Sequence, residues 1–208
     1  MRKLGVFSGK GGVGKTTVAI NIAATLAKDF YKDVLLIEGN LTTPHLGPFL
    51  GLDPRDDRET PIPRLHVEAY PKDKKEIIEE IKVSKGYDFM ILDTAPGFSD
   101  EAKMFTDTVE EVVAVTSPKM DSIVDVMRLV ERLEKDVVEH GIVMNRVKNE
   151  SYEVPLERTE EKTGLPVIEA LPESEKIGEI TTTQKPLTEL HPDSEEHEKF
   201  EKISSYIL

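Results

Sequence analysis

Short runs of apolar residues recur along the chain and alternate with stretches in which apolar residues stand three or four positions apart. The runs predict buried strands, because a strand covered on both faces of a sheet is apolar throughout. They lie at residues 3–8, 34–37, 89–92, 112–115, 141–144 and 166–170, and residues 65–69 alternate like a more exposed strand. The wider spacing predicts helices at residues 16–28, 72–85, 123–130 and 153–162, and a closing helix at 193–207.

Strands that alternate with helices predict an α/β fold, with a mostly parallel sheet of about seven strands and helices on both of its faces. The 208 residues contain no internal repeat and no low-complexity linker, so we expect a single domain over residues 1–208. Residues 51–64 carry many charges and three prolines, and we interpret them as an exposed connection.

A glycine-rich loop separates the first predicted strand from the first predicted helix. From Gly9 to Thr16 it fits G-x-x-x-x-G-K-[ST], the phosphate-binding loop of P-loop NTPases. Its glycines let backbone N–H groups point at phosphates, and the helix start adds unpaired donors. Lys15 would reach the β- and γ-phosphates, and the Thr16 hydroxyl would bind Mg²⁺. We expect the nucleotide to contact Gly9, Lys10, Gly11, Gly12, Val13, Gly14, Lys15, Thr16 and Thr17.

The same letters also fit G-x-G-x-x-G, the dinucleotide-binding pattern, with Glu38 placed as the acid that binds a ribose. Lys15 and Thr16 directly follow the last glycine, and a pyrophosphate needs neither of them. The P-loop interpretation is therefore favoured.

Four apolar residues end in Asp93, which matches the Walker B pattern. A carboxylate at a strand end beside a phosphate loop can hold Mg²⁺ through a water molecule. An aspartate that caps a helix would give the same local pattern. The presence of Lys15 and Thr16 upstream favours the metal site.

The lysine early in the loop, in the form Gly-Lys-Gly-Gly-Val-Gly-Lys-Thr-Thr, resembles the deviant Walker A motif of the MinD/ParA ATPases. The resemblance implies a cytoplasmic ATPase that binds ATP or ADP with Mg²⁺ and forms an ATP-dependent homodimer. In such a dimer Lys10 crosses the interface to the partner's nucleotide. It also implies a protein partner or activator, and a role in cell-division-site positioning, DNA partition or a related assembly process. Members that share an iron–sulfur cluster use cysteines, and this chain has none.

Two later segments resemble the adenine pocket of that family. Asn145 and Arg146 follow a strand, where an amide can pair a donor and an acceptor with the base edge. Pro172 and Glu173 would form the other wall. Either segment alone could instead be an ordinary turn between a strand and a helix.

The first switch departs from the family, which commonly has Asp-x-Asp where this chain has Glu38-Gly39-Asn40. The second Asp positions the attacking water, whereas Asn40 can orient a water but cannot accept its proton. Glu38 could serve the metal or Lys10, or act as the acid in a shifted register. We hypothesise normal binding of Mg–ATP and slow hydrolysis, with Asn40→Asp raising turnover. A nonhydrolytic ATP-binding module and a small-molecule ligase or kinase of the wider superfamily are the alternatives.

The charge balance limits the partners. There are 27 basic and 40 acidic residues, a net charge of −13, so we expect no direct contact with nucleic acid. The chain has no apolar run long enough to span a membrane. In the closing helix, Phe200, Ile203 and Ile207 form a small apolar face with mixed flanking charges, so we expect it to pack on the domain, with membrane contact peripheral at most. The five histidines show no metal-ligand spacing and are interpreted as surface or partly packed residues.

Overall fold

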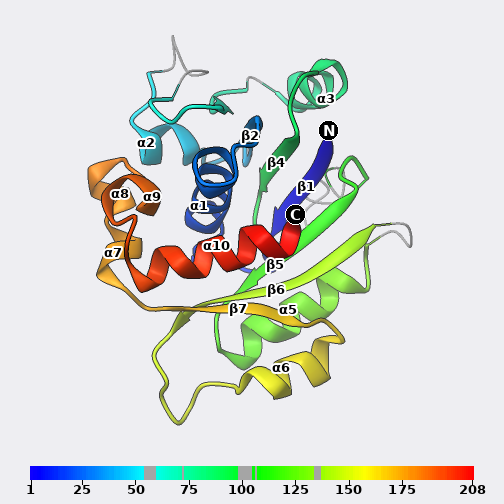
Figure 1. Cartoon of the computed structure of the whole chain (residues 1–208). Coiled ribbons are helices and arrows are strands. Elements are labelled where there is room, and N and C mark those ends of the chain that lie inside the picture. Colours follow the sequence, from blue (N-terminus) through cyan, green and yellow to red (C-terminus); the bar gives the residue numbers. More distant parts are fainter. Residues whose placement is uncertain (54–59, 72, 98–104, 106, 134–136) are drawn as a thin grey trace.

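The computed structural model describes residues 1–53, 60–71, 73–97, 105, 107–133 and 137–208. Within this part of the chain, seven strands form one sheet in the order β3-β2-β4-β1-β5-β6-β7, and every neighbouring pair is parallel (Figure 1). The strands are β1 (Arg2–Phe7), β2 (Val34–Gly39), β3 (Leu65–Glu68), β4 (Phe89–Thr94), β5 (Glu111–Thr116), β6 (Val138–Val147) and β7 (Val167–Pro172). The predicted single α/β domain is confirmed, and the sheet is parallel throughout.

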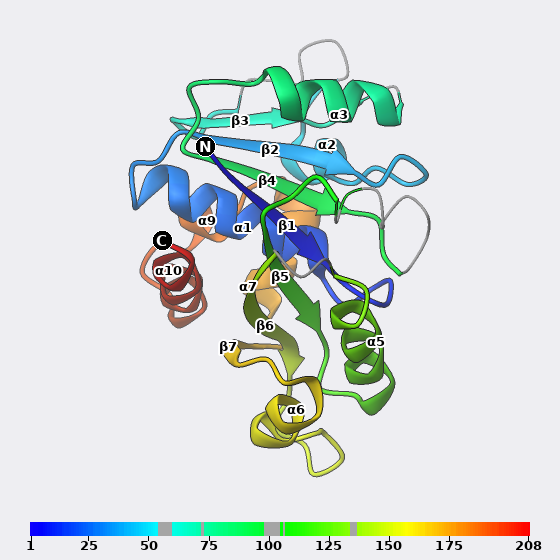
Figure 2. The same cartoon turned by 90° about the vertical axis from the view of Figure 1, so that its right-hand side faces the viewer.

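Helices cover both faces of this sheet, as Figure 2 shows. On one face lie α1 (Lys15–Lys28), α2 (Leu46–Leu50), α7 (Glu175–Gly178), α8 (Ile180–Thr183), α9 (Leu187–Leu190) and α10 (Glu195–Ile207). On the other face lie α3 (Lys74–Val83), α5 (Met120–Val130) and α6 (Leu156–Thr163).

The two layers of helices explain the apolar runs. In β2, Val34 and Leu36 belong to the core under α1, whereas Leu35 and Ile37 belong to the core under α3. Successive side chains of a strand point to opposite faces, so a strand that is covered twice must be apolar at every position.

The C-terminal helix α10 packs against the domain, as predicted. Phe200, Ile203 and Ile207 are almost fully buried in the core that α1 also enters. Ser194 caps the helix by accepting a hydrogen bond from the backbone N–H of His197. None of the described helices is both long and apolar enough to span a bilayer.

One histidine lies close to two acidic residues, although the spacing of the histidines in the sequence indicated no metal ligands. His197 on α10 lies near Asp29 and Glu201, and the potential ligand atoms of the three residues are within 4.8 Å of one another. His197 Nε2 is 3.1 Å from Asp29 Oδ2. This direct contact accounts for the cluster and joins α10 to the end of α1.

Some elements differ from their predicted form. The helix expected at 153–162 begins at Leu156, because Glu153 instead closes a turn by accepting the backbone N–H groups of Lys148 and Glu150. Pro155 then precedes the first helical residue. The short helices α2, α7, α8 and α9 have too few residues to show a periodic pattern. In the connection at 51–64, Ile62 is buried, and residues 54–59 lie outside the described part.

Candidate nucleotide-binding site

Strand order brings the predicted site together at the carboxyl edge of the sheet. The P-loop follows β1, the first switch follows β2, and β4 lies between these two strands. Asp93 of β4 is in register with Val6 of β1 and with Glu38 of β2. Because all strands are parallel, their carboxyl ends meet at one edge, where α/β proteins bind ligands.

The P-loop has the backbone that its glycines permit. Gly12 and Gly14 have φ values of 81° and 91°, which disfavour any residue with a Cβ. A Cβ at Gly9 would overlap Asp125 of α5, and one at Gly14 would overlap the amide of Asn145. Helix α1 begins at Lys15 with no side-chain cap and no acidic residue in its first turn. Its unpaired N–H groups and the positive end of its dipole therefore favour an anion.

Three of the predicted residues meet inside the site. Lys15 Nζ donates to Asp93 Oδ1 at 2.5 Å, and Thr16 Oγ1 donates to Asp93 Oδ2 at 2.6 Å. The side chains of Lys15 and Asp93 are only 7% and 1% exposed. The carboxylate and the hydroxyl are hard oxygen donors beside an anion-binding loop, so they fit the coordination that Mg²⁺ prefers.

Glu38 is fully buried and organises the switch loop. Its Oε1 accepts the backbone N–H of Asn40 at 2.8 Å, and its Oε2 accepts those of His45 and Leu46 at 2.7 and 3.0 Å. Burial raises the pKa of Glu38 to about 7, and the nearby charge of Asp93 adds to this rise. The three N–H groups act in the opposite direction. Both carboxylate oxygens are thus engaged in holding residues 40–46.

This buried carboxyl gives a pH prediction. The pKa of Glu38 is about 7 in the folded protein and about 4.5 in the unfolded chain. Between these values the folded state binds more protons, so the contribution of Glu38 to stability falls as pH rises from 4.5 to 7. We expect this fall to be at most about 3 kcal/mol. Urea unfolding at pH 5 and pH 8 measures it for the parent and for Glu38→Gln. The free energy of unfolding should fall more between pH 5 and pH 8 in the parent than in Glu38→Gln. An equal fall in both proteins would contradict the raised pKa of Glu38.

Asn40 is turned into the loop. Its Nδ2 donates to Thr43 Oγ1 at 2.9 Å, and its Oδ1 accepts the backbone N–H of Thr43 at 3.3 Å. The amide that was predicted to orient a water molecule therefore already closes a turn with both of its polar atoms.

Lys10 differs from the other lysine of the loop in its partner and its exposure. It pairs with Asp121 in the first turn of α5, and the two side chains are 50% and 57% exposed. The hydrogen bond between them raises the pKa of Lys10 and lowers that of Asp121. Lys10 is thus a surface cation, whereas Lys15 is enclosed.

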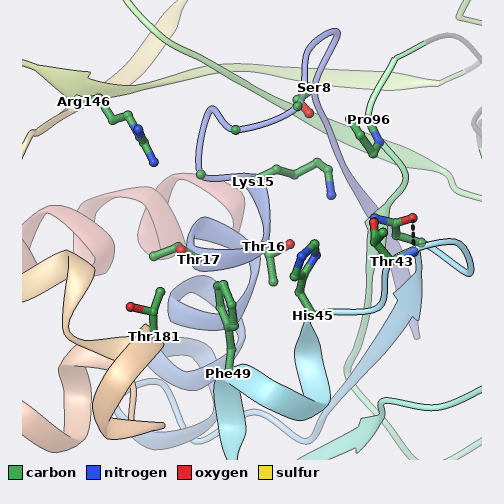
Figure 3. Close-up of a pocket in the computed structure, with 14 residues that line it drawn as sticks. Ser8, Lys15, Thr16, Thr17, Thr43, His45, Phe49, Pro96, Arg146 and Thr181 are labelled. Atoms are coloured by element: carbon green, nitrogen blue, oxygen red, sulfur yellow. Dashed lines mark hydrogen bonds between the residues drawn. The ribbon is translucent and has the colours of Figure 1, made fainter.

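Several cavities lie beside the loop. One cavity of about 350 Å³ is lined by P-loop residues, Asn40 and Pro96 (Figure 3). It is also lined by residues that were not assigned to the site from the sequence: Thr43, His45, Phe49 and Thr181. Thr43 and His45 belong to the loop that follows β2, whereas Phe49 and Thr181 carry no local signal, because they reach the cavity only through the packing of α2 and α8 beside α1. A smaller cavity, of about 100 Å³, is lined by both predicted walls of the adenine pocket: Asn145, Arg146, Pro172 and Glu173.

Asn145 connects the smaller cavity to the P-loop. Its Nδ2 donates to the backbone oxygen of Val13 in the P-loop at 2.8 Å, and its side chain is buried. The smaller cavity is therefore held at a fixed position relative to the phosphate loop.

A parallel α/β sheet with a glycine loop between β1 and α1, and a buried aspartate at the end of β4, defines a nucleotide-binding domain of the P-loop class. The family described as the CobQ/CobB/MinD/ParA nucleotide binding domain matches residues 4–187, and the chain belongs to this family.

Individual relatives are distant but cover most of the chain. An uncharacterized ATP-binding protein of Methanocaldococcus jannaschii is 26% identical over 99% of this chain and 87% of its own length. The septum site-determining protein MinD of Synechocystis is 27% identical over 88% of this chain and 80% of its own length. The structure of MinD from Pyrococcus horikoshii, complexed with Mg-ADP, is 26% identical and superposes with a TM-score of 0.89 over 99% of this chain and 95% of that one.

Proposed function

We propose that this protein is an Mg–ATP-dependent dimerising switch with slow intrinsic ATPase activity. The observation that carries the proposal is the difference in exposure between the two P-loop lysines: the side chain of Lys15 is 7% exposed and that of Lys10 is 50% exposed. An enclosed lysine can serve the nucleotide of its own chain. An exposed cation beside the same loop is available to a second molecule.

Within one chain, the phosphates would lie on the loop from Gly9 to Thr17, at the start of α1. Thr16 would bind Mg²⁺ directly and Asp93 would bind it through water, while Lys15 would move from Asp93 to the phosphates. The ion supplies neutralisation of phosphate charge. Asn145, Arg146, Pro172 and Glu173 would enclose the base, which the smaller cavity supports.

Between two chains, Lys10 would leave Asp121 and contact the phosphates of the partner's nucleotide. Hydrolysis would remove the charge that holds the dimer, and the output would be an interaction that depends on the bound nucleotide. The MinD relatives favour cell-division-site positioning over DNA partition. We expect a protein partner or activator, and a cytoplasmic location.

Mass in solution tests the switch. We expect a monomer without nucleotide and with ADP, and a dimer with ATP and Mg²⁺. Lys10→Ala should bind Mg–ATP and remain a monomer, because only the contact across the interface is lost. Lys162→Ala, which removes an exposed lysine of α6, is the matched control and should dimerise like the parent.

Other outcomes identify the alternatives. A mass that never changes, with tight ATP binding and no phosphate release, would indicate a nonhydrolytic ATP-binding module. Turnover that appears only with an added acceptor would indicate a small-molecule ligase or kinase.

A further inference from the structure

The loop after β2 offers the phosphate cavity a proton acceptor that is not an aspartate. Glu38 uses both oxygens on backbone N–H groups, and Asn40 uses both polar atoms on Thr43. The imidazole of His45 lines the same cavity. Among the described residues, no hydrogen-bond partner is found for its ring nitrogens. His45 is therefore the uncommitted base of this loop.

The structure fixes where this ring lies. The backbone N–H of His45 is held by Glu38 at 2.7 Å, and its backbone oxygen accepts the N–H of Phe49 at 2.9 Å as α2 begins. Its ring packs against that of Phe49, with centroids 5.6 Å apart. Figure 3 shows the imidazole pointing into the cavity that Lys15 and Thr16 also enter. A residue anchored on both sides of its backbone can present its ring to the phosphates in a reproducible position.

Imidazole differs from the Asn40 amide in its ability to accept a proton from the attacking water. A neutral imidazole has one nitrogen with a free lone pair that can accept a proton, whereas an amide cannot be protonated usefully near neutral pH. We propose that His45 accepts the proton of the water that attacks the γ-phosphate, in place of the carboxylate that Asn40 does not provide. The inference rests on the proposed hydrolysis of Mg–ATP.

In this step water cleaves the bond that joins the γ-phosphate to the rest of ATP. The water oxygen forms a bond to the γ-phosphorus, and the bond between that phosphorus and the bridging oxygen breaks, with its electron pair leaving on ADP. The proton of the water passes to His45 and from there to solvent. The products are ADP and inorganic phosphate, and a positioned base of this kind contributes about 10² to 10⁴ in rate.

Phosphate release at saturating Mg–ATP, with ATP affinity measured in parallel, tests the assignment in four proteins: the parent, His45→Ala, Asn40→Asp and the double variant. We expect His45→Ala to lower turnover by about 10²-fold with unchanged ATP affinity. Asn40→Asp should raise turnover, and the double variant should recover at least the parent rate because the aspartate supplies the missing acceptor. His66→Ala is the matched control, since His66 lies on β3 against Tyr87 and outside the cavity.

Three results would overturn the assignment: an unchanged rate in His45→Ala, a loss explained by weaker ATP binding, or a double variant that stays inactive. The second result would make His45 a nucleotide-binding residue only. The proposed switch is tested by a different result: it would be refuted if ATP did not produce a dimer. A protein that dimerises with ATP and hydrolyses it equally well without His45 refutes only this inference.

Discussion

Lys15→Met is expected to weaken Mg–ATP binding by about 30-fold or more, because truncating one member of a desolvated charge pair costs about 2–5 kcal/mol. The same change should destabilise the protein without nucleotide. Lys15 is the partner of Asp93, and Glu38 lies in register beside that carboxylate. Removing one partner of a buried ion pair costs about 3–5 kcal/mol, since the other charge stays buried alone.

This loss of stability should depend on pH. The pKa of Glu38 is about 7, so below neutrality the two neighbouring carboxyl groups can take up a proton and relieve their repulsion. The destabilisation by Lys15→Met should therefore be larger at pH 8 than at pH 6.

Calorimetric titration with Mg–ATP and urea unfolding without nucleotide measure the two effects. Lys82→Met, at an exposed position of α3, is the matched control and should change neither quantity. Normal ATP affinity in Lys15→Met would contradict the proposed contact between Lys15 and the phosphates. If the variant loses ATP affinity as expected but its free energy of unfolding does not change, the contact between Lys15 and Asp93 contributes nothing to the stability of the fold.

Phe200→Ala is expected to lower the free energy of unfolding by about 3–5 kcal/mol, because the ring is fully buried between α10 and the sheet and its removal leaves a cavity. Tyr206 lies on the same helix and is 52% exposed, so Tyr206→Ala should cost less than about 1 kcal/mol.

Urea unfolding of the two variants and the parent shows whether α10 is packed on the domain in solution. Equal and small losses in both variants would show that α10 is not held on the domain in solution. The prediction that the C-terminal helix packs inward would then be wrong.

Much of the site was readable without a structure because its signals are local. A phosphate loop needs glycines, a lysine and a hydroxyl at fixed offsets between a strand and a helix, so Gly9 to Thr17 carry the pattern in consecutive letters. Asp93 is marked by the buried strand before it. The apolar runs of β1, β2, β4 and β5 likewise follow from burial on two faces. The alternation of strands with helices predicted the α/β fold.

The remaining features depend on contacts between distant segments. The strand order places Glu38 beside Asp93, and no local pattern encodes which strands become neighbours. The pairing of Lys10 with Asp121 joins positions 111 residues apart. The sequence marked Asn40 as a substitution, but only the folded loop has its amide engaged with Thr43 and the ring of His45 in the cavity. The sequence shows which hydrogen bonds a side chain can form. Its actual partners are the groups that tertiary packing places within about 3 Å of it.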